Sequence, residues 1–273
     1  MHTIEVVIPA YNAERFLREA VESCLQSEVR RVWVVDDKSP DGTLTVARDL
    51  GDEHGDRIGV VALHENMGQY AACNTLLAYL KDNTSYVMPS LIGFLDSDDI
   101  ATGDRFRATR AAFEADDALQ VFSGQMETID EEGRKTKASY DSLPEDPSII
   151  LARESKHVLI NGVMTIRSDV LDILGGYEAA SGGADTEFIV RAFYAGLKMR
   201  NTKQVLGYRR VHRAQCTSHT GTDPERAAYR TRIAGSWTWW KALKARGRLR
   251  QKHLRIAPVT ADKFTVHRFR DRD

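Results

Sequence analysis

Three carboxylates crowd into four consecutive positions, where the chain reads Asp96-Ser97-Asp98-Asp99. Carboxylates this close repel one another, so the cluster is unfavourable after an apolar run unless a cation compensates its charge. Mg²⁺ and Mn²⁺ prefer oxygen ligands, and in proteins they often bridge to phosphate groups. The cluster is therefore a candidate metal site. The alternative is an ordinary turn with a helix cap, because aspartate also favours turns.

A second acidic pair, Asp36 and Asp37, follows the apolar run at 32–35. Further along, Asp41 and Gly42 are typical of a turn, and Asp41 is a candidate cap for the helix that follows. That interpretation leaves the acidic pair unexplained. A carboxylate at this place could accept hydrogen bonds from a ribose or a nucleobase.

The elements that must position these residues alternate along the first hundred residues. Apolar runs predict strands at 4–8, 32–35, 58–63 and 91–95, and helical spacing predicts helices after Asn12, at 43–50 and at 70–80. This order favours an α/β fold with an open, largely parallel sheet and helices on both faces. Ligands of such sheets bind beyond the carboxyl ends of the strands, where Asn12, Asn66 and both acidic groups lie. We also expect Asn12 to cap the first helix.

The later residues continue this pattern less regularly. We predict a helix at 105–115, a strand at 119–123, a turn-rich loop at 130–147, a helix entered from Gly183-Ala184-Asp185, a strand at 205–211 and a long helix that Asp223 caps.

The composition suits one large domain or two small ones, because 42% of the 273 residues are hydrophobic and 28% are charged. No apolar run reaches about 18 residues, and the N-terminus lacks the pattern of a signal peptide. The cysteines Cys24, Cys73 and Cys216 are scattered, so we expect core thiols and a cytoplasmic setting. The motifs of serine hydrolases, P-loop NTPases and zinc proteases are absent from the sequence.

The C-terminal tail differs in charge from the rest of the chain. From Arg226 to the end there are 14 Lys and Arg against 3 Asp and Glu, or +11, and the preceding residues carry −12. Its helical part combines an apolar stripe with basic residues, namely Ile233, Trp237, Trp240, Leu243, Lys241, Lys244, Arg246, Arg248 and Arg250. Three interpretations stay open: a helix packed on the body, a helix on an anionic membrane surface, or a contact with nucleic acid. We expect the tail to govern engagement of the acceptor or of a surface rather than the chemistry.

Seven short motifs follow one another in a characteristic order. They are Val-Ile-Pro-Ala-Tyr-Asn at 7–12, Val-Asp-Asp-Lys-Ser-Pro-Asp-Gly-Thr at 35–43, Asn-Met-Gly at 66–68, Phe-Leu-Asp-Ser-Asp-Asp at 94–99, Gly-Gly-Tyr at 175–177, Gly-Ala-Asp-Thr-Glu-Phe at 183–188 and Tyr-Arg-Arg-Val-His at 208–212. Together they resemble family 2 glycosyltransferases of the GT-A fold, over roughly residues 3–220. The resemblance implies a transferase domain at 1–223, with a nucleotide-binding half at 1–100 and an acceptor or catalytic half at 101–223. A basic helical extension at 224–273 would follow.

The resemblance also implies a role for each matching residue. The nucleotide sugar would contact Pro9, Ala10, Tyr11, Asn12, Asp37, Asn66, Gly68, Asp96 and Asp98. Asp98 would bind a divalent metal, Mn²⁺ or Mg²⁺, with His212 as a further ligand and Asp99 as a neighbouring acid of open role. Asp185 matches the position of the general base. The alternatives are a helix cap for Asp185 and an ordinary surface side chain for His212.

The implied reaction is inverting transfer of a sugar from a nucleoside diphosphate, a UDP-sugar above all, to an acceptor hydroxyl. The acceptor stays open between a glycan, a lipid-linked molecule and a modified DNA base, and the expected location is cytoplasmic or peripheral at a membrane. Two positions depart from the family, because Ala184 stands where many members have Glu and residues 69–74 lack a frequent Arg. The alternative function is a silent nucleotide-sugar-binding module, which would not need both Asp98 and Asp185.

Overall fold

The computed structural model describes residues 2–139, 142–154, 156–178, 183–213, 215 and 224–268. Within these residues the strands are β1 (Ile4–Ala10), β2 (Val29–Asp36), β3 (Ile58–Leu63), β4 (Leu91–Phe94), β5 (Ile100–Ala101), β6 (Leu119–Ile129), β7 (Lys135–Ser139), β8 (Thr165–Arg167), β9 (Lys198–Arg210) and β10 (Phe264–Arg268). The α-helices are α1 (Leu17–Ser23), α2 (Thr43–His54), α3 (Gln69–Asp82), α4 (Arg105–Glu114), α5 (Ser148–Leu151), α6 (Val170–Leu174), α7 (Ala184–Tyr194) and α8 (Pro224–Ala245).

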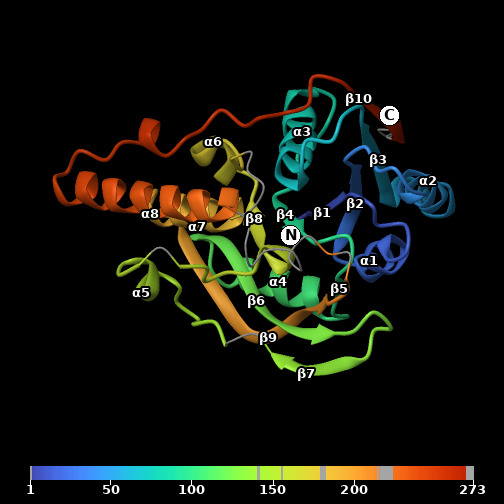
Figure 1. The fold of residues 1–273 in the computed structure, drawn as a ribbon, viewed down its shortest axis with the longest axis horizontal. Coiled ribbons are helices and arrows are strands. Elements are labelled where there is room, and N and C mark those ends of the chain that lie inside the picture. Colours follow the sequence, from blue (N-terminus) through green and yellow to red (C-terminus); the bar gives the residue numbers. More distant parts are fainter. Residues whose placement is uncertain are drawn as a thin grey trace.

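The strands of the described chain form one mixed sheet in the order β10-β3-β2-β1-β4-β8-β6-β9-β5, with β7 paired to β6 (Figure 1). β3, β2, β1 and β4 are parallel neighbours, as the β-α-β order predicts. In the second half β8 is antiparallel to β4 and β6, and β5 to β9, whereas β6 and β9 run parallel. The two predicted halves therefore share one sheet, and β1, β2 and β4 end at the same edge.

The parallel strands are buried on both faces, because successive residues alternate between two hydrophobic clusters. Val7 and Val35 pack with α3, α6 and α7. Ile8 and Val34 pack with α1, α2 and α4 on the opposite face. Strands covered on both sides are continuous apolar runs in sequence, which is why these four are visible there.

The first helix begins differently from its prediction. Asn12 is not the cap: its backbone is left-handed (φ 56°), its N–H bonds Ser39 Oγ at 3.1 Å, and the N-cap of α1 is Phe16. Asp41 likewise lies one residue before the N-cap of α2, but its carboxylate still accepts the Thr43 N–H at 3.1 Å. Contacts between the loops after β1 and β2 therefore override local capping preference.

Several short elements of the second half are not in the prediction, among them β7 and α6. The loop at 130–147 contains β7, which pairs antiparallel with β6 beyond a turn closed by the Gly133 N–H and the Asp130 carbonyl at 3.1 Å. α6 precedes the Gly175 turn, and Gly175 ends it in a left-handed conformation (φ 88°). Both elements are short, so neither has enough residues for a clear period.

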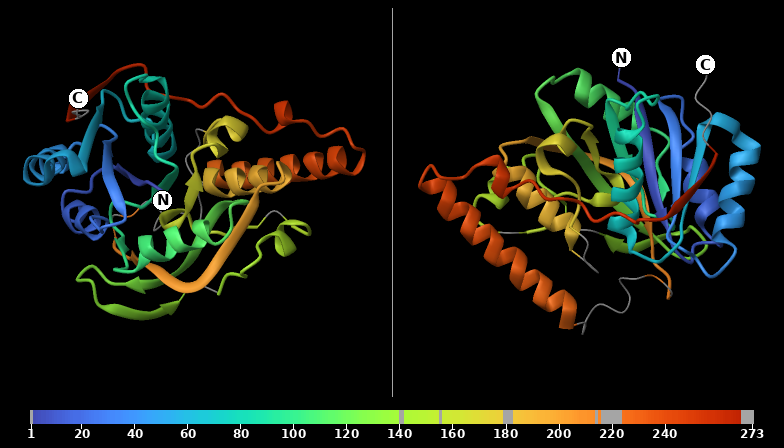
Figure 2. Two further views of the ribbon diagram at one scale, coloured as in Figure 1. Left: turned by 180° about the vertical axis from the view of Figure 1, so that it is seen from behind. Right: turned by 90° about the horizontal axis from the view of Figure 1, so that it is seen from above.

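The C-terminal tail is α-helical over α8 and forms one further 3₁₀ turn at Gln251–His253, so the expectation of a helical extension is wrong for most of the residues beyond α8. After α8 the chain returns past α6 and α3 and adds β10 antiparallel to the edge of β3 (Figures 1 and 2). The Ile256 N–H bonds the Leu174 carbonyl at 3.0 Å, and the Ala261 N–H bonds Thr75 Oγ1 at 2.8 Å. The predicted Asp223 cap lies outside the described residues.

Cys24 and Cys73 are buried free thiols, as predicted for core residues, while Cys216 lies outside the described residues. In the described chain, no helix combines the length and the apolar character that crossing a bilayer requires.

Candidate active site

The acidic loop at 96–99 follows β4 and is fixed by β9. The Asp99 N–H bonds the Asp96 carbonyl at 3.1 Å, which closes a tight turn. The Asp99 carboxylate is buried and accepts the Arg210 N–H at 2.9 Å, and Arg210 Nε donates to the Asp98 carbonyl at 3.0 Å. Burial, with repulsion from Asp98 and Asp96, raises the pKa of Asp99. Asp99 thus joins the loop to β9, while Asp96 and Asp98 are more exposed.

His212 meets Asp98 across 114 residues of sequence, with His212 Nε2 at 2.9 Å from Asp98 Oδ2. The imidazole packs against Phe16, with ring centroids 4.8 Å apart, and the His212 N–H bonds Gln215 Oε1 at 2.9 Å. Its side chain is 11% exposed, so the alternative of an ordinary surface histidine is wrong. The structure therefore brings together the two residues that the motifs propose as metal ligands.

Asp96 lies in the most crowded part of the loop. Burial, followed by repulsion from Asp98 and Asp185, raises its pKa to about 7. Within the described residues its carboxylate accepts no hydrogen bond, and Gly162 lies against it: a Cβ there would be 3.5 Å from Asp96 Oδ2 and 3.4 Å from Asp99 Oδ2. Crowded acids with raised pKa values are an arrangement that a bound cation relieves.

Arg105, at the start of α4, is fully buried behind these acids, and sequence reasoning misses it. Its Nη1 donates to the Gly162 carbonyl at 3.1 Å and its Nη2 to the Phe94 carbonyl at 2.5 Å. Burial lowers its pKa to about 10, against the attraction of neighbouring groups that include Asp99 and Asp96. Its sequence signal is a charged residue on the apolar face of a helix, and its position makes it a counter-charge for the acidic loop.

Asp37 clamps the loop after β3. Its two carboxylate oxygens accept the Met67 and Gly68 N–H groups, both at 2.7 Å, and its own N–H bonds the Ala10 carbonyl at 2.8 Å. The residue is 2% exposed, and burial raises its pKa although the two N–H donors oppose the shift. Asp37 therefore joins the ends of β1, β2 and β3, and its contact with a nucleotide stays a prediction.

The other residues proposed for the nucleotide differ in what they can present. Pro9 is partly buried and Ala10 is 1% exposed within β1, so Ala10 can offer only its main chain. Tyr11 is 52% exposed and free to stack on a base. Asn66 is exposed, and Gly68 is the left-handed N-cap of α3 (φ 84°). The N-terminus of this 14-residue helix favours an anion beside it.

Asp185 is the second residue of α7, which follows the left-handed N-cap Gly183 (φ 86°). Its Oδ1 accepts the Thr186 N–H at 2.7 Å, and its side chain is 21% exposed. The alternative of a helix cap is therefore wrong in position, because Gly183 fills the cap. Asp185 acts on Asp96 electrostatically, so α7 contributes a fourth acid to the site.

His157 is a neighbour of Asp185 that sequence reasoning misses. Its Nδ1 lies 3.6 Å from Asp185 Oδ2 and 3.1 Å from Thr186 Oγ1. The two residues are 28 positions apart and come from a loop and a helix, so no local motif reveals the contact.

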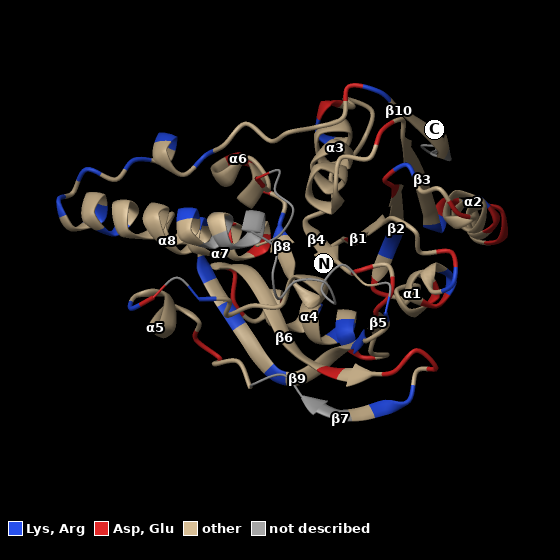
Figure 3. Ribbon diagram, in the orientation of Figure 1, with Lys and Arg blue, Asp and Glu red and all other residues tan. Residues whose placement is uncertain are grey.

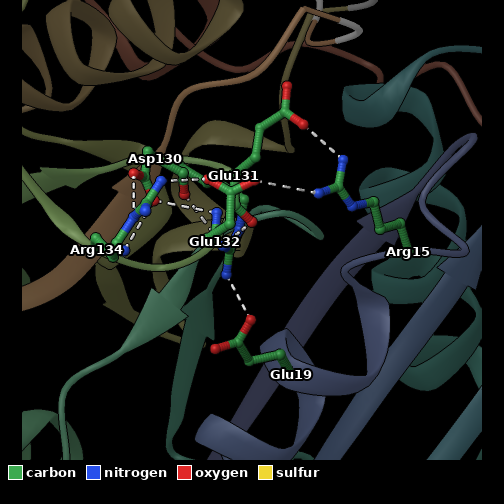
Figure 4. A network of polar contacts seen from close by, with 7 residues as sticks. Arg15, Glu19, Asp130, Glu131, Glu132 and Arg134 are labelled. Atoms are coloured by element: carbon green, nitrogen blue, oxygen red, sulfur yellow. Dashed lines mark hydrogen bonds and ion pairs between the residues drawn. The ribbon is translucent and has the colours of Figure 1, made fainter.

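Arg210 also ties the site to α1 and to the β6–β7 turn. Its guanidinium donates to Glu19 Oε2 at 2.5 Å and to the Glu131 carbonyl at 2.9 Å. Figure 4 shows the surrounding network, in which Arg15 reaches Glu131 at 2.6 Å and Arg134 pairs with Asp130 at 2.8 Å. The exposed pairs add little stability each, whereas the buried Arg210 fixes the strand that precedes His212.

Comparison with known proteins assigns the family. The model of the family described as Glycosyl transferase family 2 matches residues 5–174, more than half of the chain. Among curated proteins, the putative glycosyltransferase EpsE of Bacillus subtilis (strain 168) is 26% identical over 208 residues, which cover 74% of this chain and 71% of that protein.

Solved structures share the fold. S. aureus TarS 1-349 in complex with UDP-GlcNAc matches with a TM-score of 0.67 at 20% identity, covering 92% of this chain and 69% of that chain. The mannosyltransferase PcManGT from Pyrobaculum calidifontis, in complex with GDP-Man and Mn²⁺, matches with a TM-score of 0.54 at 19% identity, covering 90% of this chain and 65% of that chain. The predicted GT-A type α/β fold is thereby confirmed.

Proposed function

Because this chain belongs to glycosyl transferase family 2, and is therefore a glycosyltransferase, we propose that it transfers a sugar from a nucleoside diphosphate to an acceptor hydroxyl in one inverting displacement. The observation that carries the proposal is the convergence of four groups from three parts of the chain. Asp96 and Asp98 follow β4, Asp185 begins α7 and His212 follows β9. This convergence supports the proposal, because the four groups would serve as a cation site and a base, which a binding module would not need together.

The donor would lie over the ends of β1 to β4, with its base near Tyr11 and its diphosphate between the N-terminus of α3 and the acidic loop. Two solved relatives of the fold are complexes with UDP-GlcNAc and GDP-Man, which supports a nucleotide sugar as donor. We favour a UDP-sugar. Contacts from Pro9, Ala10, Asn12, Asn66 and Gly68 would be made mainly through main-chain atoms and the loop surfaces they form.

The residues present fit a divalent metal, Mn²⁺ or Mg²⁺. Asp98 and His212 are ligand types that Mn²⁺ accepts, and the crowded Asp96 offers a further oxygen. Such a cation, when bound, would stabilise the charge of the departing diphosphate. Asp99 would not be a direct ligand, because it is buried and accepts the Arg210 N–H.

Asp185 would take the proton of the acceptor hydroxyl. A base must be ionised before it can accept a proton, and two features of its position favour the carboxylate. It lies in the first turn of α7, where the helix dipole stabilises negative charge, and it accepts the Thr186 N–H at 2.7 Å.

The acceptor stays open between a glycan, a lipid-linked molecule and a modified DNA base. We retain 1–100 as the nucleotide-binding half, 101–223 as the acceptor half and 224–273 as the extension, together with a cytoplasmic or membrane-peripheral location, as parts of this proposal.

The metal arm of the proposal is tested by calorimetric titration of UDP with and without Mn²⁺. We expect Mn²⁺ to strengthen UDP binding by about tenfold or more in the native protein, and we expect Asp98→Ala to remove that gain. Asp104→Ala is the matched control, because Asp104 is an exposed acid close by in sequence whose carboxylate pairs with the exposed Arg107. Metal-dependent binding that survives in Asp98→Ala would refute this assignment.

A further inference from the structure

The far end of the tail carries an unusual concentration of positive charge. No acidic residue occurs between Glu225 and Asp262. The seven Lys and Arg residues at its centre, here called the basic cluster, are all exposed: Lys241, Lys244, Arg246, Arg248, Arg250, Lys252 and Arg255. Figure 3 shows basic residues along the far part of α8 and the segment after it, with no acidic residue among them.

The basic cluster is not neutralised by the body. None of its members forms an ion pair with another residue that the structure describes. Arg255 approaches the body closely, but its Nε donates to the Asp172 main-chain carbonyl at 3.2 Å, and the Asp172 carboxylate pairs with Lys81. Lys241 lies over the Trp237 ring and Lys244 over the Phe193 ring, but neither contact neutralises the charge. Exposed charges of one sign without acidic partners are suited to an external polyanion.

The tryptophans of the tail divide into packed and exposed. Trp240 is 5% exposed and donates to the His253 carbonyl at 3.1 Å, and Trp237 donates to the Leu151 carbonyl at 3.0 Å. The predicted stripe therefore packs on the body: Trp240 is buried and is not available to a surface, and Trp237 is half-buried. Trp239 is 51% exposed instead, and it stacks edge-on against His253 beside Arg250 and Lys252.

An open hollow lies under the same turn. A cavity of about 340 Å³ is lined by Ile173, Tyr194, Ala195, Leu249, Arg250, Gln251 and Leu254. Its lining is of mixed character, because Arg250 and Gln251 contribute polar surface beside the apolar side chains.

We propose that the basic cluster and Trp239 form a docking surface for a lipid bilayer with anionic headgroups. Lys and Arg attract the headgroups over about a Debye length, and an exposed indole beside them suits the interface between headgroups and acyl chains. A nucleic acid would also be attracted by the charge, and duplex DNA is therefore a competitor in the test below.

The surface is separate from the proposed transfer chemistry. Arg232 pairs with Glu178 at 2.6 Å near the start of α8, and Lys244 is twelve residues further along, roughly 18 Å at 1.5 Å per residue. Docking through the basic cluster therefore does not involve any residue assigned to the donor, metal or acceptor proton.

Vesicle flotation with the full chain tests the docking surface. We expect binding to vesicles of phosphatidylcholine with 30% phosphatidylglycerol, no binding to phosphatidylcholine alone, and loss of binding in 0.5 M NaCl, where the Debye length is about 4 Å. A variant with Lys241, Lys244, Arg246, Arg248 and Arg250 changed to Gln should bind on the order of 100-fold more weakly. Trp239→Ala should bind several-fold more weakly and lose part of the fluorescence blue shift on binding.

The control removes five exposed charges elsewhere, by changing Arg107, Arg134, Lys135, Lys198 and Lys203 to Gln. It has the same net charge as the cluster variant and should bind vesicles almost as the native protein does. The proposal is overturned if both variants lose vesicle binding equally. It is also overturned if the native protein binds vesicles with and without the anionic lipid equally well. Duplex DNA that binds more tightly than the vesicles and displaces them overturns it too. The assay contains no nucleotide sugar, so its failure and a failure of the proposed transfer are separate results.

Discussion

Two acidic turns at the same edge of the sheet, 36–37 after β2 and 96–99 after β4, look alike in sequence and differ in structure. The Asp37 carboxylate is saturated by two main-chain N–H groups, both at 2.7 Å. Asp96 is crowded by two other acids, which help raise its pKa to about 7, and a buried Arg105 lies behind its loop. An acid paired with the main chain holds two loops together, whereas an acid left among acids is available to a cation.

The largest expected effect is at Arg105, the buried counter-charge of the acidic loop at 96–99. Arg105→Met should lower the free energy of unfolding by about 3–5 kcal/mol, because it leaves the Phe94 and Gly162 carbonyls unpaired and the acids without a buried cation. Urea denaturation measures the loss. Arg107→Met is the control, since Arg107 is 71% exposed two residues away and should change stability by about 0.5 kcal/mol at most. A loss below about 1 kcal/mol in Arg105→Met would show that the acidic loop needs no such support.

The next largest effect is expected on catalysis, at Asp185 beside the acidic loop at 96–99. Asp185→Asn should reduce kcat by about 10²-fold or more while leaving UDP affinity unchanged, because an amide cannot accept the acceptor proton. Steady-state kinetics and UDP titration separate the two quantities. Asp169→Asn is the control, because Asp169 is exposed and caps α6 without a side-chain hydrogen bond. Near-native turnover in Asp185→Asn would assign the residue to the helix turn alone.

A smaller effect is expected at Asp37, whose carboxylate accepts two main-chain N–H groups. In Asp37→Asn one amide oxygen can still accept an N–H, but the NH₂ group faces the second N–H. We expect a loss of about 1–3 kcal/mol in the free energy of unfolding, with weaker UDP binding whether or not Mn²⁺ is present. Asp49→Asn, at an exposed position on α2, should change neither quantity. Native stability in Asp37→Asn would contradict the clamp seen at Met67 and Gly68.

The features that can be predicted from the sequence are those that depend on residues close together in the chain. The parallel strands are continuous apolar runs, and the acids follow them directly, so the edge of the sheet and its chemistry are both predictable. Arg105 contacts Gly162, 57 positions away, and His157 contacts Asp185, 28 positions away, and nothing beside either residue in sequence signals those contacts. β10 pairs with β3 about 200 residues earlier, and its five residues alone resemble any short polar strand.

The wrong prediction of a helix cap at Asn12 shows that a clear local signal can also be overridden by a distant contact. Asparagine is a favoured cap, but the Asn12 N–H finds Ser39 in the loop after β2, and the helix begins later. A residue's local preference for a capping position is only one of several ways to satisfy its hydrogen-bonding groups. A loop from elsewhere in the fold can supply a better hydrogen-bond partner, as Ser39 does for the Asn12 N–H.

The smallest expected effect, and the one of opposite sign, is at Lys38, next to the saturated acids. Lys38 has a left-handed backbone (φ 61°), which for a residue with a Cβ costs about 1 kcal/mol or more. Lys38→Gly removes that strain but gives the unfolded chain more freedom, worth about 0.5–1 kcal/mol. The net change in the free energy of unfolding should therefore lie between about zero and a gain of about 1 kcal/mol. Lys203→Gly is the matched control on β9, where no such strain exists, and it should lose about 0.5–1 kcal/mol. If both variants lose stability equally, Lys38 is not strained. If Lys38→Gly keeps its stability but binds UDP less tightly, the strain holds a positive charge toward the donor, and the saturated side would then share in binding the diphosphate.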